Sequence, residues 1–166
     1  ESVSVLMRRK DREITEPSEI TALVERCDTL RLGFCDGDTS KGALPYVVPL
    51  SFGYERTQDG FTFYVHGAKT GRRHELALSA PKVCVELDIC RQFVESTGGL
   101  TADYESFIGW GEIETVSGDE AVKGLELLCA HCGFDRMPCT QSVVDATCVE
   151  KISVSDFTAK RRFKPQ

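Results

Sequence analysis

The sequence contains no long apolar run and no surplus of positive charge. None of its apolar stretches approaches the ~20 residues of a membrane-spanning helix, so we expect no membrane as a partner. Its 26 acidic residues outnumber its 20 basic residues, which gives a formal net charge of -6. Binding to a nucleic-acid backbone needs an excess of Lys and Arg, so we do not expect a nucleic acid as a partner either.

The glycine motifs of the common nucleotide-binding folds are also missing. No G-x-G-x-x-G follows a strand pattern at the start of a helix, and no G-x-x-x-x-G-K-[ST] is present. The strands and helices that we predict do not alternate regularly, which argues against a Rossmann or TIM fold. The chain has 166 residues, 41% of them hydrophobic, and this predicts a single domain over residues 1–166.

No secretory signal pattern is visible, and this decides how the eight cysteines are interpreted. Cys27 and Cys84 lie inside apolar periodic patterns, where a free cysteine packs as a small hydrophobic residue. We therefore expect reduced thiols and a cytoplasmic location for the protein, with no disulfide framework.

One cysteine-rich segment has three interpretations. The segment "CAHCGFDRMPC" holds Cys129, His131, Cys132 and Cys139, which are ligands that structural zinc accepts. A redox Cys-x-x-Cys pair is the second interpretation, but a predicted helix ends here, and a helix C-terminus disfavours thiolate. We favour the third interpretation, buried or inactive thiols, and predict no metal.

Apolar periodicity and turn signals predict a mainly β domain with flanking helices. Helices are predicted at 15–27, 70–81 and 117–133, and strands at 29–35, 44–55, 61–67, 82–89, 105–116 and within 147–163. Short turns join most strands, so the sheet should be mostly antiparallel. Pro49 cannot donate to a strand ladder, so its strand should lie at an edge, be bulged or be interrupted. A small closed or split β-barrel would remove unpaired edges.

The segment "HGAKTGRRHE", residues 66–75, places basic side chains around two glycines between a strand and a helix. The free N–H groups at a helix N-terminus attract anions, and Lys69, Arg72 and Arg73 would add full charges. Gly67 and Gly71 would let the backbone approach a phosphate closely. The pattern fits a phosphate site, although an ordinary polar turn would also have this composition.

Three segments in this order carry a family resemblance: "LPYVVPLSFGYE", "FTFYVHGAKTGRRHELA" and "PKVCVELD". They resemble the FMN-binding split-barrel superfamily of pyridoxamine 5'-phosphate oxidase-like proteins, and in particular its 5-nitroimidazole resistance protein group. The resemblance implies a six-stranded antiparallel split β-barrel and a homodimer with FMN at the interface. The C-terminal "KRRF" departs from the pattern with which true pyridoxamine-phosphate oxidases bind the substrate phosphate, so we do not assign that activity.

The resemblance also implies roles for individual residues. Residues 48–51 would line the flavin ring, residues 66–68 would lie along the ribityl chain or the edge of the ring, and Lys69, Gly71, Arg72 and Arg73 would hold the phosphate. Ser106, Trp110 and Gly111 would approach either the flavin or the substrate, from this chain or from the partner chain. The implied cofactor-binding residues are Val48, Pro49, Leu50, Ser51, His66, Gly67, Ala68, Lys69, Gly71, Arg72, Arg73, Ser106 and Trp110, with Gly111 beside Trp110.

These expectations describe a flavoprotein oxidoreductase. FMN would take electrons from NAD(P)H and pass them to a small acceptor such as a nitroimidazole, with His66 as the candidate catalytic residue. His66 could instead be a hydrogen-bonded residue at the rim, and Trp110 could belong to the core. Two other functions remain open: a flavin- or haem-binding module without turnover, and a structural dimer with an empty site.

Overall fold

The structure, a computed structural model, describes residues 7–163. The predicted domain also included residues 1–6 and 164–166, which lie outside the described residues. The helices are α1 (Pro17–Arg26), α2 (Arg72–Ser79), α3 (Gly118–His131) and α4 (Gln141–Ala146), with short 3-10 turns at Lys10–Arg12 and Thr39–Lys41. The strands are β1 (Leu30–Phe34), β2 (Tyr46–Leu50), β3 (Gly53–Arg56), β4 (Phe61–Gly67), β5 (Lys82–Ser96), β6 (Gly99–Val116) and β7 (Cys148–Arg161).

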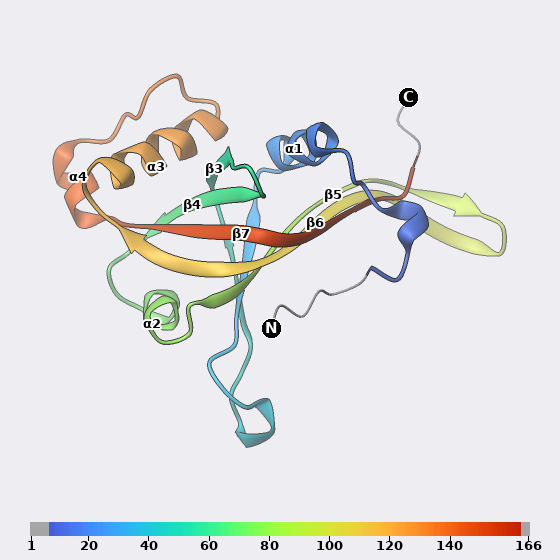
Figure 1. The fold of residues 1–166 in the computed structure, drawn as a ribbon, viewed down its shortest axis with the longest axis horizontal. Coiled ribbons are helices and arrows are strands. Elements are labelled where there is room, and N and C mark those ends of the chain that lie inside the picture. Colours follow the sequence, from blue (N-terminus) through green and yellow to red (C-terminus); the bar gives the residue numbers. More distant parts are fainter. Residues whose placement is uncertain (1–6, 164–166) are drawn as a thin grey trace.

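The described strands form one antiparallel sheet in the order β2-β1-β5-β6-β7-β4-β3 (Figure 1). This confirms the predicted mainly β class with flanking helices. The sheet has seven strands where the resemblance implied six, because residues 44–55, expected as one strand, form β2 and β3. Pro49 lies in β2 at the edge of the sheet, in register with Arg31 of β1, as the missing donor of proline requires.

The sheet must curl on itself. β2 and β3 occupy opposite ends of the strand order, yet only Ser51 and Phe52 separate them along the chain. Three residue steps span at most about 11 Å, so the two ends of the sheet lie close together. The result is a split barrel with Phe52 fully buried inside it.

Alternating side chains fill the barrel. Val83, Val85 and Leu87 of β5 are buried, while the residues between them face outward. Aromatic rings complete the core: Phe61 packs edge-to-face on Phe107, with ring centroids 5.6 Å apart. The core therefore lies between the curled strands and the helices that cover them.

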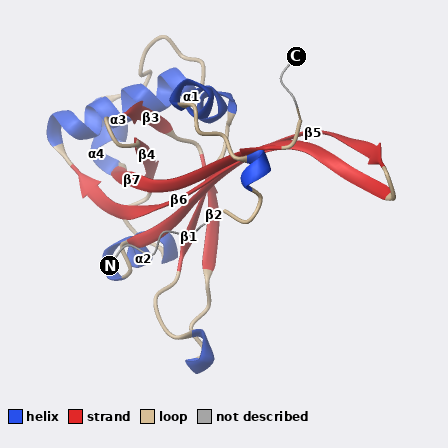
Figure 2. Ribbon diagram, turned by 45° about the vertical axis from the view of Figure 1, so that its right-hand side comes forward, coloured by secondary structure: helices blue, strands red, loops and turns tan. Residues whose placement is uncertain are grey.

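The helices lie on both sides of the sheet, with α1 and α3 above the strands and α2 below them (Figure 2). α3 packs on β3 and β4, and its backbone passes so close to Gly53 that a Cβ there would collide with Leu128. α2 lies on the opposite side, below β7 and β6 in Figure 1. No helix within residues 7–163 is long and apolar enough to cross a membrane.

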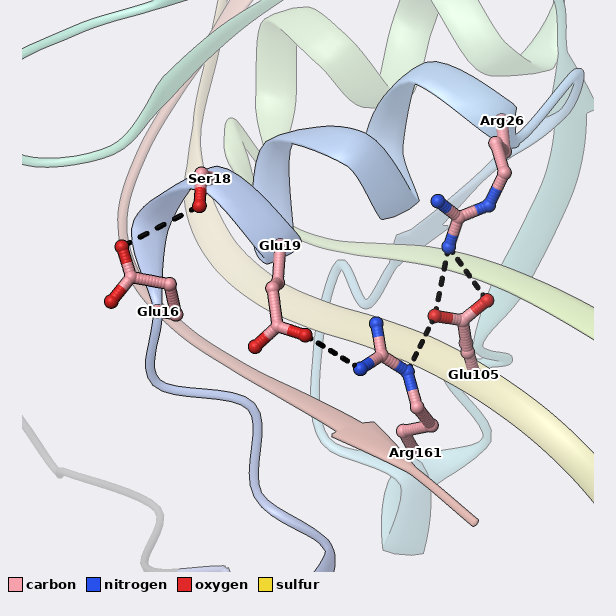
Figure 3. Close-up of polar contacts among 6 residues, drawn as sticks. All are labelled: Glu16, Ser18, Glu19, Arg26, Glu105 and Arg161. Atoms are coloured by element: carbon pink, nitrogen blue, oxygen red, sulfur yellow. Dashed lines mark hydrogen bonds and ion pairs between the residues drawn. The ribbon is translucent and has the colours of Figure 1, made fainter. Parts of the chain in front are cut away.

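A buried carboxylate ties α1 to the sheet (Figure 3). Glu105 of β6 accepts hydrogen bonds from Arg26 at 2.7 and 2.8 Å and from Nε of Arg161 at 2.8 Å. Its side chain is only 1% exposed. Arg161 also donates to Glu19 of α1, so the helix, β6 and β7 share one ionic network.

β5 and β6 continue past the barrel as a two-stranded arm, residues 91–101, which projects to the right in Figure 1. Phe93 and Leu100 on this arm are 79% and 78% exposed. Large apolar side chains at such exposure, on strands without a covering layer, are a feature of surfaces that contact another molecule.

Candidate functional site

The segment between β4 and α2 gathers the predicted basic residues at one corner, residues 66–73, which we call the cationic corner. Gly71 precedes α2 with φ of 99°, a backbone conformation that glycine adopts without strain. No side chain caps the start of α2. The first N–H groups of this helix therefore remain available to an acceptor, and they carry the positive end of the helix dipole.

Arg73 lies against the backbone of Gly67. A Cβ at Gly67 would meet the guanidinium of Arg73, so this guanidinium would have to shift if Gly67 were replaced. Nη1 of Arg73 donates to Glu150 of β7, and both side chains are mostly buried, 12% and 1% exposed. Nη2 of Arg73 is buried and has no hydrogen-bond partner among the described residues. An unpaired guanidinium nitrogen is a donor that an anionic ligand can satisfy.

The other two cations of the corner extend in different directions. Lys69 donates to the backbone carbonyl of Asp145, at 2.5 Å, and so joins the corner to α4. Arg72 pairs with Asp36 at 3.3 Å, and its side chain is 51% exposed. The structure thus brings the three cations to one helix start, but each of them has a protein partner.

His66 is exposed at the end of β4, opposite Val149 of β7. Partial burial of its ring, and then the charge of Arg73, lower the pKa of His66 below its ordinary value. The imidazole is therefore neutral at neutral pH, with one ring nitrogen as donor and the other as acceptor.

An apolar groove of about 650 Å³ lies on the outer face of the sheet. Its floor is a row of residues paired across strands β2, β1, β5, β6 and β7, namely Val47, Gly33, Cys84, Trp110 and Asp156. Gly33 in this row has no side chain and so leaves space for a planar group, and Trp110 is a half-buried wall of the groove. The groove was not predicted from the sequence as a unit, because its residues come from five separate segments.

The predicted ring-binding segment of β2 does not line this groove. Val48 and Leu50 are half-buried and pack against the core, while Pro49 and Ser51 are exposed. Trp110 lines the groove, as does Gly111.

The other predicted residues take different places. Ser106 is buried at a different level of β6, while Gly67 and Ala68 belong to the cationic corner.

The groove and the cationic corner are linked along the chain and by one ion pair. Cys35 lines the groove, and the next residue, Asp36, is the ion-pair partner of Arg72. α2 leads directly into β5, whose first residue, Lys82, also lines the groove. A ligand with an anionic group at the corner could therefore extend toward the groove along these residues.

The cysteine-rich segment begins in the last turn of α3, and among the described residues it does not gather its ligands. Cys129 is half-buried, whereas Cys132 and Cys139 are exposed. Burial, followed by its two cysteine neighbours, raises the pKa of the Cys129 thiol, so this thiol is protonated at neutral pH. Within residues 7–163 the ligand atoms that do cluster belong to His74, Cys148 and Glu150, which lie elsewhere.

Comparisons with known proteins agree with the fold. A family model described as pyridoxamine 5'-phosphate oxidase matches residues 16–161. A proposed 5-nitroimidazole antibiotic resistance protein from Bacteroides thetaiotaomicron is 26% identical, with 89% of this chain and 85% of that chain aligned at a TM-score of 0.75. A search of curated proteins finds no match.

Two more distant structures share the fold. The flavocytochrome Anf3 from Azotobacter vinelandii is 19% identical, with 98% of this chain and 74% of that chain covered and a TM-score of 0.70. An FAD- and heme-binding protein from Mycobacterium smegmatis is 16% identical, with 93% and 76% covered and a TM-score of 0.74. At these identities the likeness concerns the fold alone.

Proposed function

Because this chain belongs to the pyridoxamine 5'-phosphate oxidase family, we propose that it is a flavoprotein that binds FMN and transfers electrons from NAD(P)H to a small acceptor. The similarity to a proposed 5-nitroimidazole resistance protein makes a nitroimidazole the first acceptor to test. Bound FMN would supply the redox chemistry, and the chain would supply binding, orientation and electrostatics.

The unpaired nitrogen of Arg73 is the observation that carries the proposal. A buried donor without a partner costs about 1–3 kcal/mol, and a phosphate oxygen would remove this cost. Gly67 lets the guanidinium of Arg73 lie close to the backbone, and the uncapped start of α2 offers further N–H donors. The residues of the corner therefore fit the phosphate of FMN in both charge and access.

Glu150 partly neutralises Arg73, so Lys69 and Arg72 must provide most of the free positive charge. Both are more exposed than Arg73, and their present partners, a carbonyl and one carboxylate, exchange readily with solvent. A phosphate would replace these contacts with charge-assisted hydrogen bonds.

We propose that the flavin ring occupies the apolar groove beside Trp110, within reach of the outer backbone groups of the edge strand β2. Residues 48–51 do not line the groove of their own chain, so their implied contact with the ring would come from a second copy of the chain. The exposed Val47 in the groove, at 63%, and Phe93 and Leu100 on the arm support a homodimer that covers these surfaces.

His66 is our candidate for the proton donor in acceptor reduction. It lies at the corner next to Gly67 and is exposed to solvent, from which it could be reprotonated. Its lowered pKa leaves the ring neutral at neutral pH, and a neutral imidazole is a weak acid. Proton donation should therefore require a developing negative charge on the acceptor.

A binding module without turnover is the second candidate. Two proteins of the same fold are described as a flavocytochrome and as an FAD- and heme-binding protein. A haem would therefore be the alternative occupant of the groove.

The absorbance spectrum of the purified protein separates these possibilities. The proposal predicts an oxidised-flavin spectrum and its bleaching by NAD(P)H, followed by recovery of the spectrum on addition of a nitroimidazole. A Soret band would favour the haem module, and flavin that NAD(P)H does not bleach would favour flavin binding without this activity. A colourless protein that takes up neither cofactor would contradict both.

A further inference from the structure

A second cluster of chemically active side chains lies behind the cationic corner. His74 of α2 approaches Cys148 of β7, with Nδ1 and Sγ 3.7 Å apart. Glu150 lies two residues further along β7, and the ligand atoms of the three residues all lie within 4.8 Å of one another. None of the three has a part in the proposed flavin chemistry, although Glu150 pairs with Arg73.

The spacing suits a tetrahedral ion. Zinc binds sulfur at about 2.3 Å and imidazole nitrogen at about 2.0–2.1 Å, which places the two ligands about 3.6 Å apart in a tetrahedral site. The observed 3.7 Å between Nδ1 and Sγ matches this separation. A nitrogen, a sulfur and a carboxylate oxygen are also the ligand types that zinc accepts.

Glu150 is oriented for a second partner. Arg73 donates to its Oε2, while its Oε1 is buried and has no hydrogen-bond partner among the described residues. An ionised carboxylate oxygen without a partner is costly at 1% exposure. Metal-ligating carboxylates commonly accept a hydrogen bond on the other oxygen, which fixes their orientation.

We propose that His74, Cys148 and Glu150 bind a divalent transition-metal ion of the zinc type, with Arg73 as the residue that orients Glu150. His74 and Cys148 line a cavity of about 600 Å³ on the side of α3 and α4, and this cavity gives an ion access to the site. Three protein ligands leave one coordination position for water or a small ligand.

The state of the thiol provides a clear signature. A cysteine thiol is ordinarily protonated at neutral pH, because its usual pKa is about 8.5. A metal binds the thiolate, so binding must release a proton. This release depends on Cys148 and does not depend on whether flavin is bound.

The test is a titration of the full-length, chelator-treated protein with Zn²⁺ and Co²⁺. Calorimetry in two buffers of different ionisation enthalpy should give one ion per chain and proton release. Co²⁺ difference spectra should show a cobalt–thiolate band. Cys148→Ser should abolish the band, and His74→Gln should weaken binding at least about tenfold, since even loss of an outer-shell partner costs that much.

Cys132→Ser is the matched control, because it removes an exposed thiol from the cysteine-rich segment and leaves the cluster intact. It should retain the band. Thermal unfolding of each variant shows whether it is folded, and His74→Gln gives the decisive result if Cys148→Ser does not fold. The proposal would be overturned if folded wild-type protein showed no thiolate band. It would also be overturned if Cys132→Ser lost the band while Cys148→Ser kept it.

Discussion

Glu105→Gln should be among the most destabilising single substitutions that leave side-chain volume unchanged. The Glu105 carboxylate accepts hydrogen bonds from Arg26 and Arg161 and is almost completely buried. Glutamine keeps one carbonyl oxygen as an acceptor but removes the charge. After the substitution, the two guanidinium groups face an amide whose NH2 group cannot accept a hydrogen bond.

The magnitude follows from how exposed each partner is. Removing one partner of a buried ion pair costs about 3–5 kcal/mol. The side chain of Arg26 is 43% exposed and can regain water, whereas that of Arg161 is 12% exposed. We therefore expect the substitution to lower the free energy of unfolding by about 3 kcal/mol, the lower end of this range. For a domain of this size, that loss lowers Tm by about 6–12 °C.

The assay compares thermal and urea unfolding of wild-type, Glu105→Gln and Glu95→Gln proteins at neutral pH. Glu95 is an exposed carboxylate on the β5–β6 arm, so its substitution should change stability by no more than about 0.5 kcal/mol. If Glu105→Gln unfolds at the same urea concentration as wild type with the same m value, the ionic network does not stabilise the fold.

The difference in stability between wild type and Glu105→Gln should also depend on pH. Burial alone would raise the pKa of Glu105, but the hydrogen bonds from Arg26 and Arg161 outweigh it and hold this pKa below its ordinary value of 4.5. A carboxyl with a lowered pKa in the folded state stabilises the protein above the ordinary value and loses this effect as pH falls through the folded pKa. The stability difference between wild type and Glu105→Gln should therefore be full at neutral pH and shrink in acid. A constant difference from pH 7 into the acid range would contradict this.

Two further predictions concern the proposed function. His66→Ala should keep its flavin but lose about 10²–10⁴-fold in turnover of the acceptor, and unchanged turnover with flavin bound would exclude His66 as proton donor. Phe93→Ser combined with Leu100→Ser should convert a dimer into monomers by light scattering without lowering the far-ultraviolet circular dichroism signal; a wild-type protein that is already monomeric would contradict the dimer.

Local signals predicted the helix ends well. The helix predicted at 117–133 has Gly133 as its last residue, and this glycine follows α3 with a φ of 88°. Its N–H donates to Ala130, and the N–H of Phe134 donates to Cys129, which is the Schellman pattern. A glycine after an apolar helix carries this information in a few neighbouring residues, so no tertiary contact was needed to predict it.

The division of residues 44–55 into β2 and β3 could not be predicted. Val48, Leu50 and Phe52 face the core at a period of two, and this alternation continues through the break. The break arises because the curled sheet places β2 and β3 at opposite ends of the strand order. That arrangement depends on pairing between strands that are far apart in the sequence, and the local alternation of apolar residues does not reveal it.

The arm and α4 were missed for a related reason. Residues 90–96 are mostly exposed, so they show no alternation of buried and exposed positions. α4 has no buried residue and therefore no apolar stripe. Their structure depends on pairing with β6 and on contacts such as the one that Lys69 makes to Asp145.

The residues of the candidate site were only partly within reach of sequence reasoning. The cationic corner is a continuous segment, and its composition suggested an anion site. The groove and the cluster of His74 and Cys148 join segments that are far apart, 74 residues in the latter case. Only the pairing of β4 with β7 brings Cys148 opposite Gly67, next to α2.

The central claim is that the cationic corner binds the phosphate of a flavin, and a comparison of FMN with riboflavin tests it most directly. The two ligands share the ring and the ribityl chain and differ in the phosphate. Their affinities would be measured by fluorescence titration for wild type, Lys69→Ala, Arg72→Ala and the control Arg136→Ala, an exposed arginine beyond α3.

Wild-type protein should prefer FMN, and each corner substitution should weaken FMN binding about tenfold, the value of one charge-assisted hydrogen bond of about 1.5 kcal/mol. Riboflavin binding should stay unchanged in all variants, and Arg136→Ala should bind both ligands like wild type. Equal affinity of wild type for the two ligands, or an equal loss of both in Lys69→Ala and Arg72→Ala, would contradict the account.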